Sequence, residues 1–139
     1  MHVSLHTDGG SRGNPGPAAA GIVLVRADTR QPLREQGILL GEATNNVAEY
    51  QGLIRGIEAA IELGATQLAI HCDSELIVKQ VKGEYKVKHA DMLPLHRKVL
   101  QLLGRVPQWT LRHIPRAQNA RADQLVNAAL DAGIDVDYT

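Results

Sequence analysis

Two aspartates stand where a strand-like apolar run ends. Asp8 ends the alternating run 2–8 and is followed by a stretch rich in Gly and Pro, 9–18. Alternating side chains are typical of a strand, and the Gly and Pro residues predict a tight turn directly after Asp8. Asp73 follows a second apolar run, 67–72. A carboxylate at the end of a rigid strand, beside backbone that a ligand can approach, indicates a metal or phosphate site, although an aspartate before a turn is often only a turn residue.

Two further carboxylates lie near the starts of predicted helices. Glu49 lies at the edge of the apolar stripe of helix 46–63, which places it at the margin of the core. Asp123 enters the first turn of a final helix, 120–132. Simpler interpretations exist, because Asp73 could cap the helix that follows it, and Glu49 and Asp123 could offset a helix dipole.

The chemistry that these four carboxylates can perform depends on whether the fold brings them together. Four converging carboxylates repel one another unless cations neutralise them. Hard cations such as Mg²⁺ prefer carboxylate and water ligands. Two such ions, about 3.5–4 Å apart, can activate a water and stabilise the attacked phosphate and the leaving oxygen during phosphodiester hydrolysis. Metal binding is therefore the better interpretation if these residues meet at one edge of a sheet.

The periodicity of the chain predicts the elements that must position these residues. The predicted strands are 2–8, 19–27, 33–40, 67–72 and 108–114, and the predicted helices are 46–63, 74–82, 91–103 and 120–132. A hairpin meander followed by strand–helix alternation predicts an α/β fold, with helices flanking a mixed sheet, in one domain over 1–139. The short acidic tail 133–139 is predicted to be flexible, and its docking as an edge strand stays open.

Composition narrows the class of protein. Hydrophobic residues make up 44% of the chain, with no Phe and one Trp, so the core must be aliphatic. No apolar run is long enough to cross a membrane and no leader precedes the first strand, so we expect a cytoplasmic protein that is not bound to a membrane. The single cysteine, Cys72, is predicted to be a small buried hydrophobic side chain of its strand.

Charge is unevenly distributed although the net charge is zero. Residues 79–122 contain ten Lys and Arg residues but only Glu84 and Asp91 as acids, so this stretch carries +8 and the rest of the chain −8. One interpretation is solvated helix faces. The other is a surface that faces a polyanion, because Lys and Arg neutralising phosphates supply most sequence-independent affinity for nucleic acids.

Four motifs occur in a specific order along the chain. They are Asp8-Gly9-Gly10, Thr44-Asn45-Asn46-Val47-Ala48-Glu49, Asp73-Ser74 and Asn119-Ala120-Arg121-Ala122-Asp123. Each motif is weak alone, but together they make the chain resemble a type 1 ribonuclease H from His2 to about Leu130. The resemblance implies a ribonuclease H-like fold, with a five-stranded mixed sheet whose second strand is antiparallel.

The resemblance also implies the residues of the site. Those implied as catalytic metal ligands, for two Mg²⁺ ions with Mn²⁺ as a substitute, are Asp8, Glu49, Asp73 and Asp123. Those implied as substrate contacts are Gly10, Asn14, Thr44, Asn45, Asn46 and Ser74. An amide both donates and accepts hydrogen bonds, which suits the 2′-hydroxyl that separates RNA from DNA. Ordinary turn and helix-cap roles are the alternatives for Asn14, Thr44 and Asn45.

This chain departs from the family pattern in three places. Glu42 stands where some members place an arginine for a DNA phosphate, which predicts a weaker phosphate pocket. The segment 83–90 is too short for the basic protrusion of many members, which predicts lower or more salt-sensitive affinity. Arg116, seven residues before Asp123, stands in place of a mobile histidine. We expect Arg116 to be catalytic through its charge, since arginine stays protonated at any working pH. The alternative is an ordinary surface arginine after Pro115.

The function that follows from the resemblance is hydrolysis of the RNA strand of RNA–DNA hybrids by a monomeric endonuclease that leaves 5′-phosphate and 3′-hydroxyl ends. The main alternative is a module that binds hybrids without cutting them. A more distant alternative is a phosphotransferase that uses Asp8 near a nucleotide. Four intact carboxylates argue against a silent module, which has no reason to tolerate their repulsion.

Overall fold

The computed structural model describes residues 1–139 and contains a single sheet of six strands. In spatial order the strands are β5 (Gln108–His113), β4 (Gln67–Cys72), β1 (His2–Ser11), β2 (Gly16–Arg26), β3 (Pro32–Ala43) and β6 (Val136–Asp137). The strand β2 is antiparallel to both β1 and β3, whereas β1, β4 and β5 are mutually parallel. The mixed α/β sheet predicted from the sequence is therefore confirmed.

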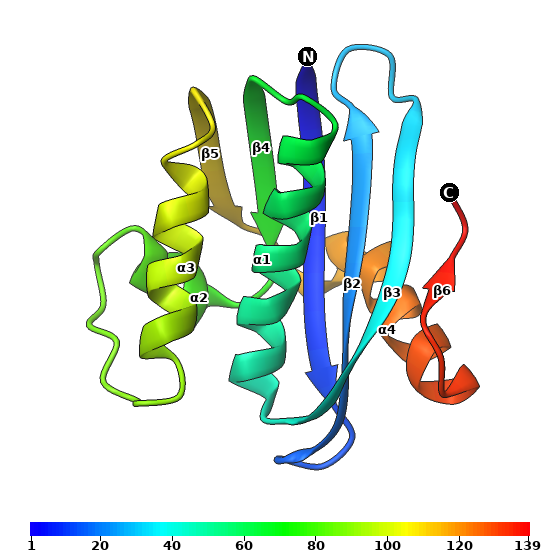
Figure 1. Cartoon of the computed structure of the whole chain (residues 1–139), viewed down its shortest axis with the longest axis vertical. Helices are drawn as coiled ribbons and strands as arrows, with labels where there is room; N and C mark the ends of the chain where they lie inside the picture. Colours follow the sequence, from blue (N-terminus) through cyan, green and yellow to red (C-terminus); the bar gives the residue numbers. More distant parts are fainter.

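Helices cover both faces of this sheet. They are α1 (Asn45–Glu62), α2 (Glu75–Val81), α3 (Leu93–Leu103), the 3₁₀ helix η1 (Arg116–Asn119) and α4 (Ala120–Ala132). Figure 1 shows α1 and α3 in front of the sheet and α4 behind it. The main aliphatic core lies on the α1 and α3 side, and a smaller cluster of Ala19, Val126 and Ala129 lies under α4. No helix in the structure combines the length and the apolar character needed to cross a membrane.

The parallel pairing of β1 and β4 explains why two of the predicted carboxylates meet. Thr7 pairs with Cys72 in this ladder. Asp8 and Asp73 are the next residues of their chains, and the carboxyl ends of parallel strands lie at the same edge of a sheet. The register therefore places the two carboxylates at neighbouring positions on the same edge of the sheet.

The structure answers one open question about strand ends and shows one prediction to be wrong. The tail 133–139, whose docking as an edge strand was left open, does dock: Val136 and Asp137 pair with β3 and add a sixth strand to the five expected. The chain does not turn directly after Asp8: β1 continues to Ser11, with Gly9 and Gly10 inside the strand. The Gly-rich signal was misinterpreted, because Gly9 is there for close packing and not for a turn.

Glycines let α1 approach β1 closely enough to bring a helix side chain to the strand end. A Cβ atom at Gly9 would overlap the backbone carbonyl of Ala48, and one at Gly52 would lie 2.6 Å from the Asp8 carbonyl oxygen. The backbones of the helix and the strand are therefore in direct contact beside Asp8. This contact brings Glu49, which follows Ala48, to the end of β1.

We expect Gly9→Ala to destabilise the protein by about 3 kcal/mol, because the added methyl meets backbone that cannot move aside as a side chain could. The shift of α1 that relieves this overlap should also reduce activity. Urea unfolding of Gly9→Ala and Gly41→Ala would test this. A Cβ at Gly41 meets nothing within 4 Å, so a loss of stability in Gly41→Ala comes from its positive φ of 71° and not from overlap with other atoms. A Gly9→Ala protein as stable as the wild type would contradict the close-packing argument.

Candidate active site

Three carboxylates converge where β1, β4 and α1 meet. Asp8, Glu49 and Asp73 each offer an oxygen, and these atoms all lie within 4.8 Å of one another. Asp8 and Glu49 are buried, with 6% and 8% of their surface exposed, and Asp73 is half-buried. Buried carboxylates that form no ion pair are unfavourable, so this arrangement has the chemistry of a cation site.

Glu49 is held from two strands. Its Oε1 accepts a hydrogen bond from the Gly9 amide at 3.0 Å, and the Cys72 thiol lies 3.7 Å from its Oε2. Glu49 is the fifth residue of α1 and lies beyond its first turn, so an interaction with the helix dipole does not explain it. The prediction that Glu49 faces the margin of the core is confirmed.

Asp73 is positioned by a residue that the sequence argument missed. Asn119 is buried at the start of α4, and its amide donates to the Thr7 carbonyl at 2.8 Å and to Asp73 Oδ2 at 3.2 Å. Its place in the fourth motif was a signal that it has a role. Asp73 does not cap the following helix, because Ser74 is the N-cap of α2 and accepts from the Ile77 amide.

A pocket of about 420 Å³ opens over these carboxylates. Its wall includes Asp123 and Arg116, the fourth predicted ligand and the predicted catalytic cation. Asp123 lies in the first turn of α4, outside the cluster of three carboxylates, with its side chain 38% exposed. The Arg116 guanidinium is 3.9 Å from Asp123 and its side chain is 83% exposed, so it is free to turn toward a ligand. The structure therefore gathers three of the four carboxylates tightly and places the fourth at the rim.

Burial and mutual repulsion make the ionised form of this site unfavourable. Burial is the main cause that raises the pKa of Asp8, and the nearby charge of Asp73 raises it further. Burial also raises the pKa of Glu49, with Asp8 as the next cause. The pKa of the Cys72 thiol is raised by burial and by Glu49, so Cys72 is a neutral S–H group. A divalent cation would reverse these shifts, because it favours the ionised carboxylates.

The raised pKa values predict that stabilisation by Mg²⁺ grows with pH. Without metal, the folded state holds protons on Asp8 and Glu49 more tightly than the unfolded chain, whose carboxyl pKa values are 3.8 and 4.5. These two groups thus stabilise the fold most at acid pH, and their contribution is lost as the pH rises through the raised values. Mg²⁺ binds the ionised form, so the rise in Tm between EDTA and Mg²⁺ should be larger at about pH 8 than at about pH 5. An equal rise at both pH values would contradict cation binding by these carboxylates.

The predicted substrate contacts divide between two neighbouring pockets. Gly10, Asn45 and Ser74 line the carboxylate pocket. Asn14, Thr44 and Asn46 line a second pocket of about 220 Å³, together with His89 and Met92.

Hydrogen bonds tie the β1–β2 turn to the start of α1. The backbone amide of Ser11 donates to the side-chain oxygen Oδ1 of Asn45 at 2.9 Å. The backbone amide of Asn45 donates to Asn14 Oδ1 at 3.1 Å. Thr44 caps α1 by accepting from the Val47 amide, so its ordinary cap role is present. The roles of these residues toward a substrate stay predictions.

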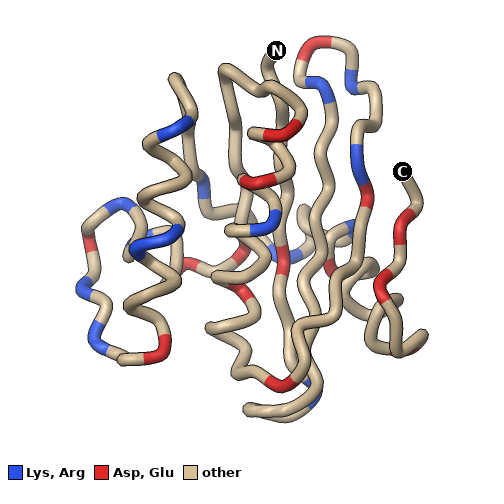
Figure 2. Tube along the Cα trace, in the orientation of Figure 1, with Lys and Arg blue, Asp and Glu red and all other residues tan.

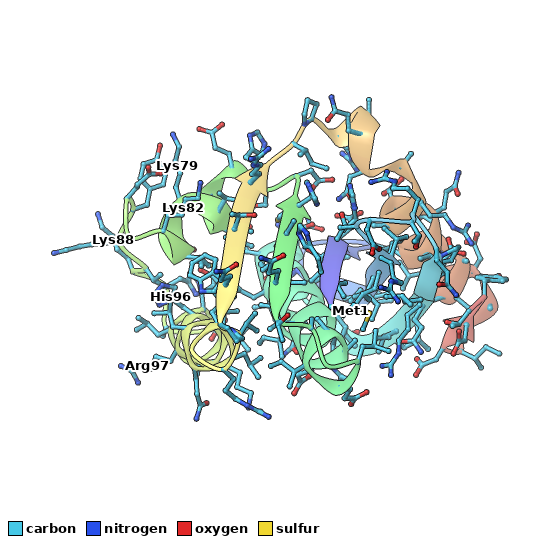
Figure 3. All side chains as sticks on the ribbon, turned by 90° about the horizontal axis from the view of Figure 1, so that it is seen from above. Met1, Lys79, Lys82, Lys88, His96 and Arg97 are labelled. Carbon is cyan, nitrogen blue, oxygen red and sulfur yellow. The ribbon has the colours of Figure 1, made fainter.

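The basic residues of the stretch 79–122 do not form one face around the carboxylates. Figure 2 shows blue segments concentrated on the loop between α2 and α3, away from the sheet. In Figure 3, Lys79, Lys82 and Lys88 extend from that side of the molecule. Lys79 is paired with Glu75, and Arg121 is paired with Glu35. Within this stretch Arg116 alone lines the carboxylate pocket.

Comparisons with known proteins agree with this fold and identify the family of the chain. Residues 6–129 match a family described as reverse transcriptase-like. The bifunctional protein Rv2228c of Mycobacterium tuberculosis is 48% identical over 95% of the chain, which spans only 36% of the length of that relative. The crystal structure of RNase H1 from Halobacterium salinarum is 42% identical, with a TM-score of 0.92, and covers 95% of this chain and 99% of its own.

A further structure, of LC11-RNase H1 in complex with an RNA/DNA hybrid, is 43% identical with a TM-score of 0.88. It covers 94% of this chain and 98% of its own. The residues matched by the family model, 6–129, include all four predicted carboxylates, Asp8, Glu49, Asp73 and Asp123. The chain belongs to the type 1 ribonuclease H family.

Proposed function

We propose that this chain is a metal-dependent endonuclease that hydrolyses the RNA strand of RNA–DNA hybrids and leaves 5′-phosphate and 3′-hydroxyl ends. The observation that carries the proposal is the convergence of Asp8, Glu49 and Asp73 within 4.8 Å at the floor of an open polar pocket. The LC11 relative, whose structure contains an RNA/DNA hybrid, supports this choice of substrate.

The donor set fits hard divalent cations. All three converging ligands are carboxylates, and the thiol and imidazole groups that favour softer metals do not line the pocket. Asp123 at the rim adds a fourth carboxylate within reach of a ligand that occupies the pocket. We propose two Mg²⁺ ions, with Mn²⁺ able to substitute.

Each part of the site has a task in this proposal. Asp8, Glu49 and Asp73 bind the cations, and burial beside Gly9 and Cys72 keeps Glu49 in place. When bound, the cations supply an activated water and stabilise charge on the attacked phosphate and the leaving oxygen. Arg116 lines the pocket with an exposed side chain beside Asp123, from where it would orient the phosphate and offset developing charge.

Recognition of the RNA strand would come from the turn and helix start beside the carboxylates. Asn45 lines the carboxylate pocket, and its side-chain oxygen Oδ1 accepts a hydrogen bond from the Ser11 backbone amide. The side-chain NH₂ group of Asn45 is left to donate to a ligand. Gly10 lies in the same wall and presents backbone without a side chain. A 2′-hydroxyl accepts such a hydrogen bond, and DNA lacks this group.

We expect the protein to cut a hybrid at least about 100-fold faster than a DNA duplex of the same sequence, because a site built to pair with a hydroxyl discriminates strongly against its absence. End-labelled duplexes incubated with Mg²⁺ would measure this ratio. A hybrid whose RNA strand carries 2′-deoxy substitutions near the cleavage position is the matched control. Equal cleavage of hybrid and DNA duplex would contradict recognition of the 2′-hydroxyl.

The alternative of a hybrid-binding module without activity makes a different prediction from the same assay, namely binding of the hybrid without products. The clustered carboxylates argue against it, since a binding module gains nothing from their repulsion. A monomeric state and a cytoplasmic location, expected from the sequence, stay predictions.

A further inference from the structure

We propose that Cys72 is a positioning residue for cation binding: its thiol fixes the carboxylate of Glu49 relative to Asp73. The inference rests on the proposed function, because it concerns the cation site of that enzyme. It differs from the prediction made from the sequence, in which Cys72 was only a small hydrophobic side chain of the core.

The contacts around Glu49 support this role. Cys72 is fully buried at the end of β4, and its Sγ lies 3.7 Å from Glu49 Oε2 in the geometry of an S–H donor. The other oxygen, Oε1, accepts from the Gly9 amide at 3.0 Å. Each oxygen of the carboxylate is therefore held by a donor from a different strand, and this fixes the rotation of the carboxylate plane as well as its position.

The place of Cys72 in the chain gives the contact a consequence for the whole site. Cys72 is followed directly by Asp73, which is itself one of the converging carboxylates. Glu49 comes from α1, which approaches the sheet from one face. The thiol therefore links Glu49, which comes from α1, to the end of β4, where the next residue is Asp73. This link limits how far the carboxylates of Glu49 and Asp73 can separate.

The expected size of the effect follows from the strength of the donor. Groups that hold a metal ligand in place typically contribute about 10- to 100-fold to metal affinity. A thiol is a weak donor, so we expect about 3- to 10-fold for Cys72. Because the contact is buried and water does not compete for it, the effect should remain measurable.

Packing is the competing explanation, since Cys72 also belongs to the main apolar core. Two substitutions of the same shape can distinguish the effect of packing from the effect of hydrogen-bond donation to Glu49. Cys72→Thr and Cys72→Val introduce the same shape and differ in one hydroxyl, which can donate to Glu49 only in the threonine variant. Any cost of the larger, branched side chain is common to both variants.

The test is to titrate EDTA-stripped protein with Mn²⁺ and with Mg²⁺ in the absence of nucleic acid. Isothermal titration calorimetry measures the Kd for each cation. We expect Cys72→Val to raise the Kd for Mn²⁺ about 3- to 10-fold and Cys72→Thr to stay within about 2-fold of wild type. In the cleavage assay, Cys72→Val should need more metal for half-maximal rate while KM for the hybrid is unchanged, as expected for a residue that does not contact substrate.

Equal Kd values for the valine and threonine variants would overturn the role of Cys72 and leave the proposed function intact. A wild-type protein that binds neither cation would overturn both proposals together. If branched side chains at this position prevent folding, Cys72→Ser and Cys72→Ala make the same comparison of a donor with no donor at smaller volume.

Discussion

Asp8→Asn protein should fold normally and lose at least about 1,000-fold of its turnover on an RNA–DNA hybrid. An amide is a neutral and poor ligand for a hard cation, and Asp8 is one of the two buried residues among the three converging carboxylates. The same change should stabilise the metal-free protein at neutral pH, because it removes one charge from a buried group of repelling carboxylates. Loss of activity together with a gain in Tm is the pattern expected for a site residue and not for a structural one.

Asp28→Asn is the matched control for Asp8→Asn. Asp28 lies in the exposed turn between β2 and β3, where it pairs with Arg26. The control should leave turnover and the response of Tm to Mg²⁺ unchanged. Turnover of purified Asp8→Asn at the rate of wild type would refute the assignment of the site.

Arg116→Ala should lower turnover about 10- to 1,000-fold, with a smaller change in hybrid affinity, because it removes one group that stabilises charge as the reaction proceeds. The structure supports this expectation, since the guanidinium lies at the rim of the carboxylate pocket beside Asp123. Its exposed side chain contributes little to the fold, so the Tm should stay within the range of ordinary surface changes.

Arg116→Lys should recover part of this loss, because lysine keeps the charge but lacks the fork of a guanidinium. A change of Arg105 to Ala provides the control, since Arg105 is an exposed cation between α3 and β5 and does not line the pocket. If Arg116→Ala turns over like wild type, Arg116 is not catalytic, and His113 at the end of β5 is the next residue to test.

The sequence predicted the elements of the site well because their signals are local. Strand alternation and helix periodicity identified β1, β4, α1 and α4, and parallel pairing of β1 with β4 was enough to bring Asp8 beside Asp73. Asp123 was placed in the first turn of its helix, as the structure has it. These results depend on patterns within about twenty residues of the chain.

What the sequence could not predict depends on contacts between distant segments. Gly9 was taken for a turn residue, since nothing in the sequence indicates that the backbone of Ala48 packs against it. The contact of Cys72 with Glu49 and the double hydrogen bond of Asn119 likewise arise from packing between separate elements. The tail was left open because two residues of strand carry too little pattern to reveal their pairing with β3.

The most direct test of the central claim is the identity of the ends produced from an RNA–DNA hybrid in the presence of Mg²⁺. We expect internal cuts in the RNA strand alone, with 5′-phosphate and 3′-hydroxyl ends, and no product in EDTA or with Asp8→Asn. Products with 2′,3′-cyclic phosphate and 5′-hydroxyl ends would mean that the 2′-hydroxyl of the RNA attacks the phosphate in place of water. Cleavage that persists in EDTA would mean that the reaction needs no bound cation. Either result would contradict hydrolysis by cations held at Asp8, Glu49 and Asp73.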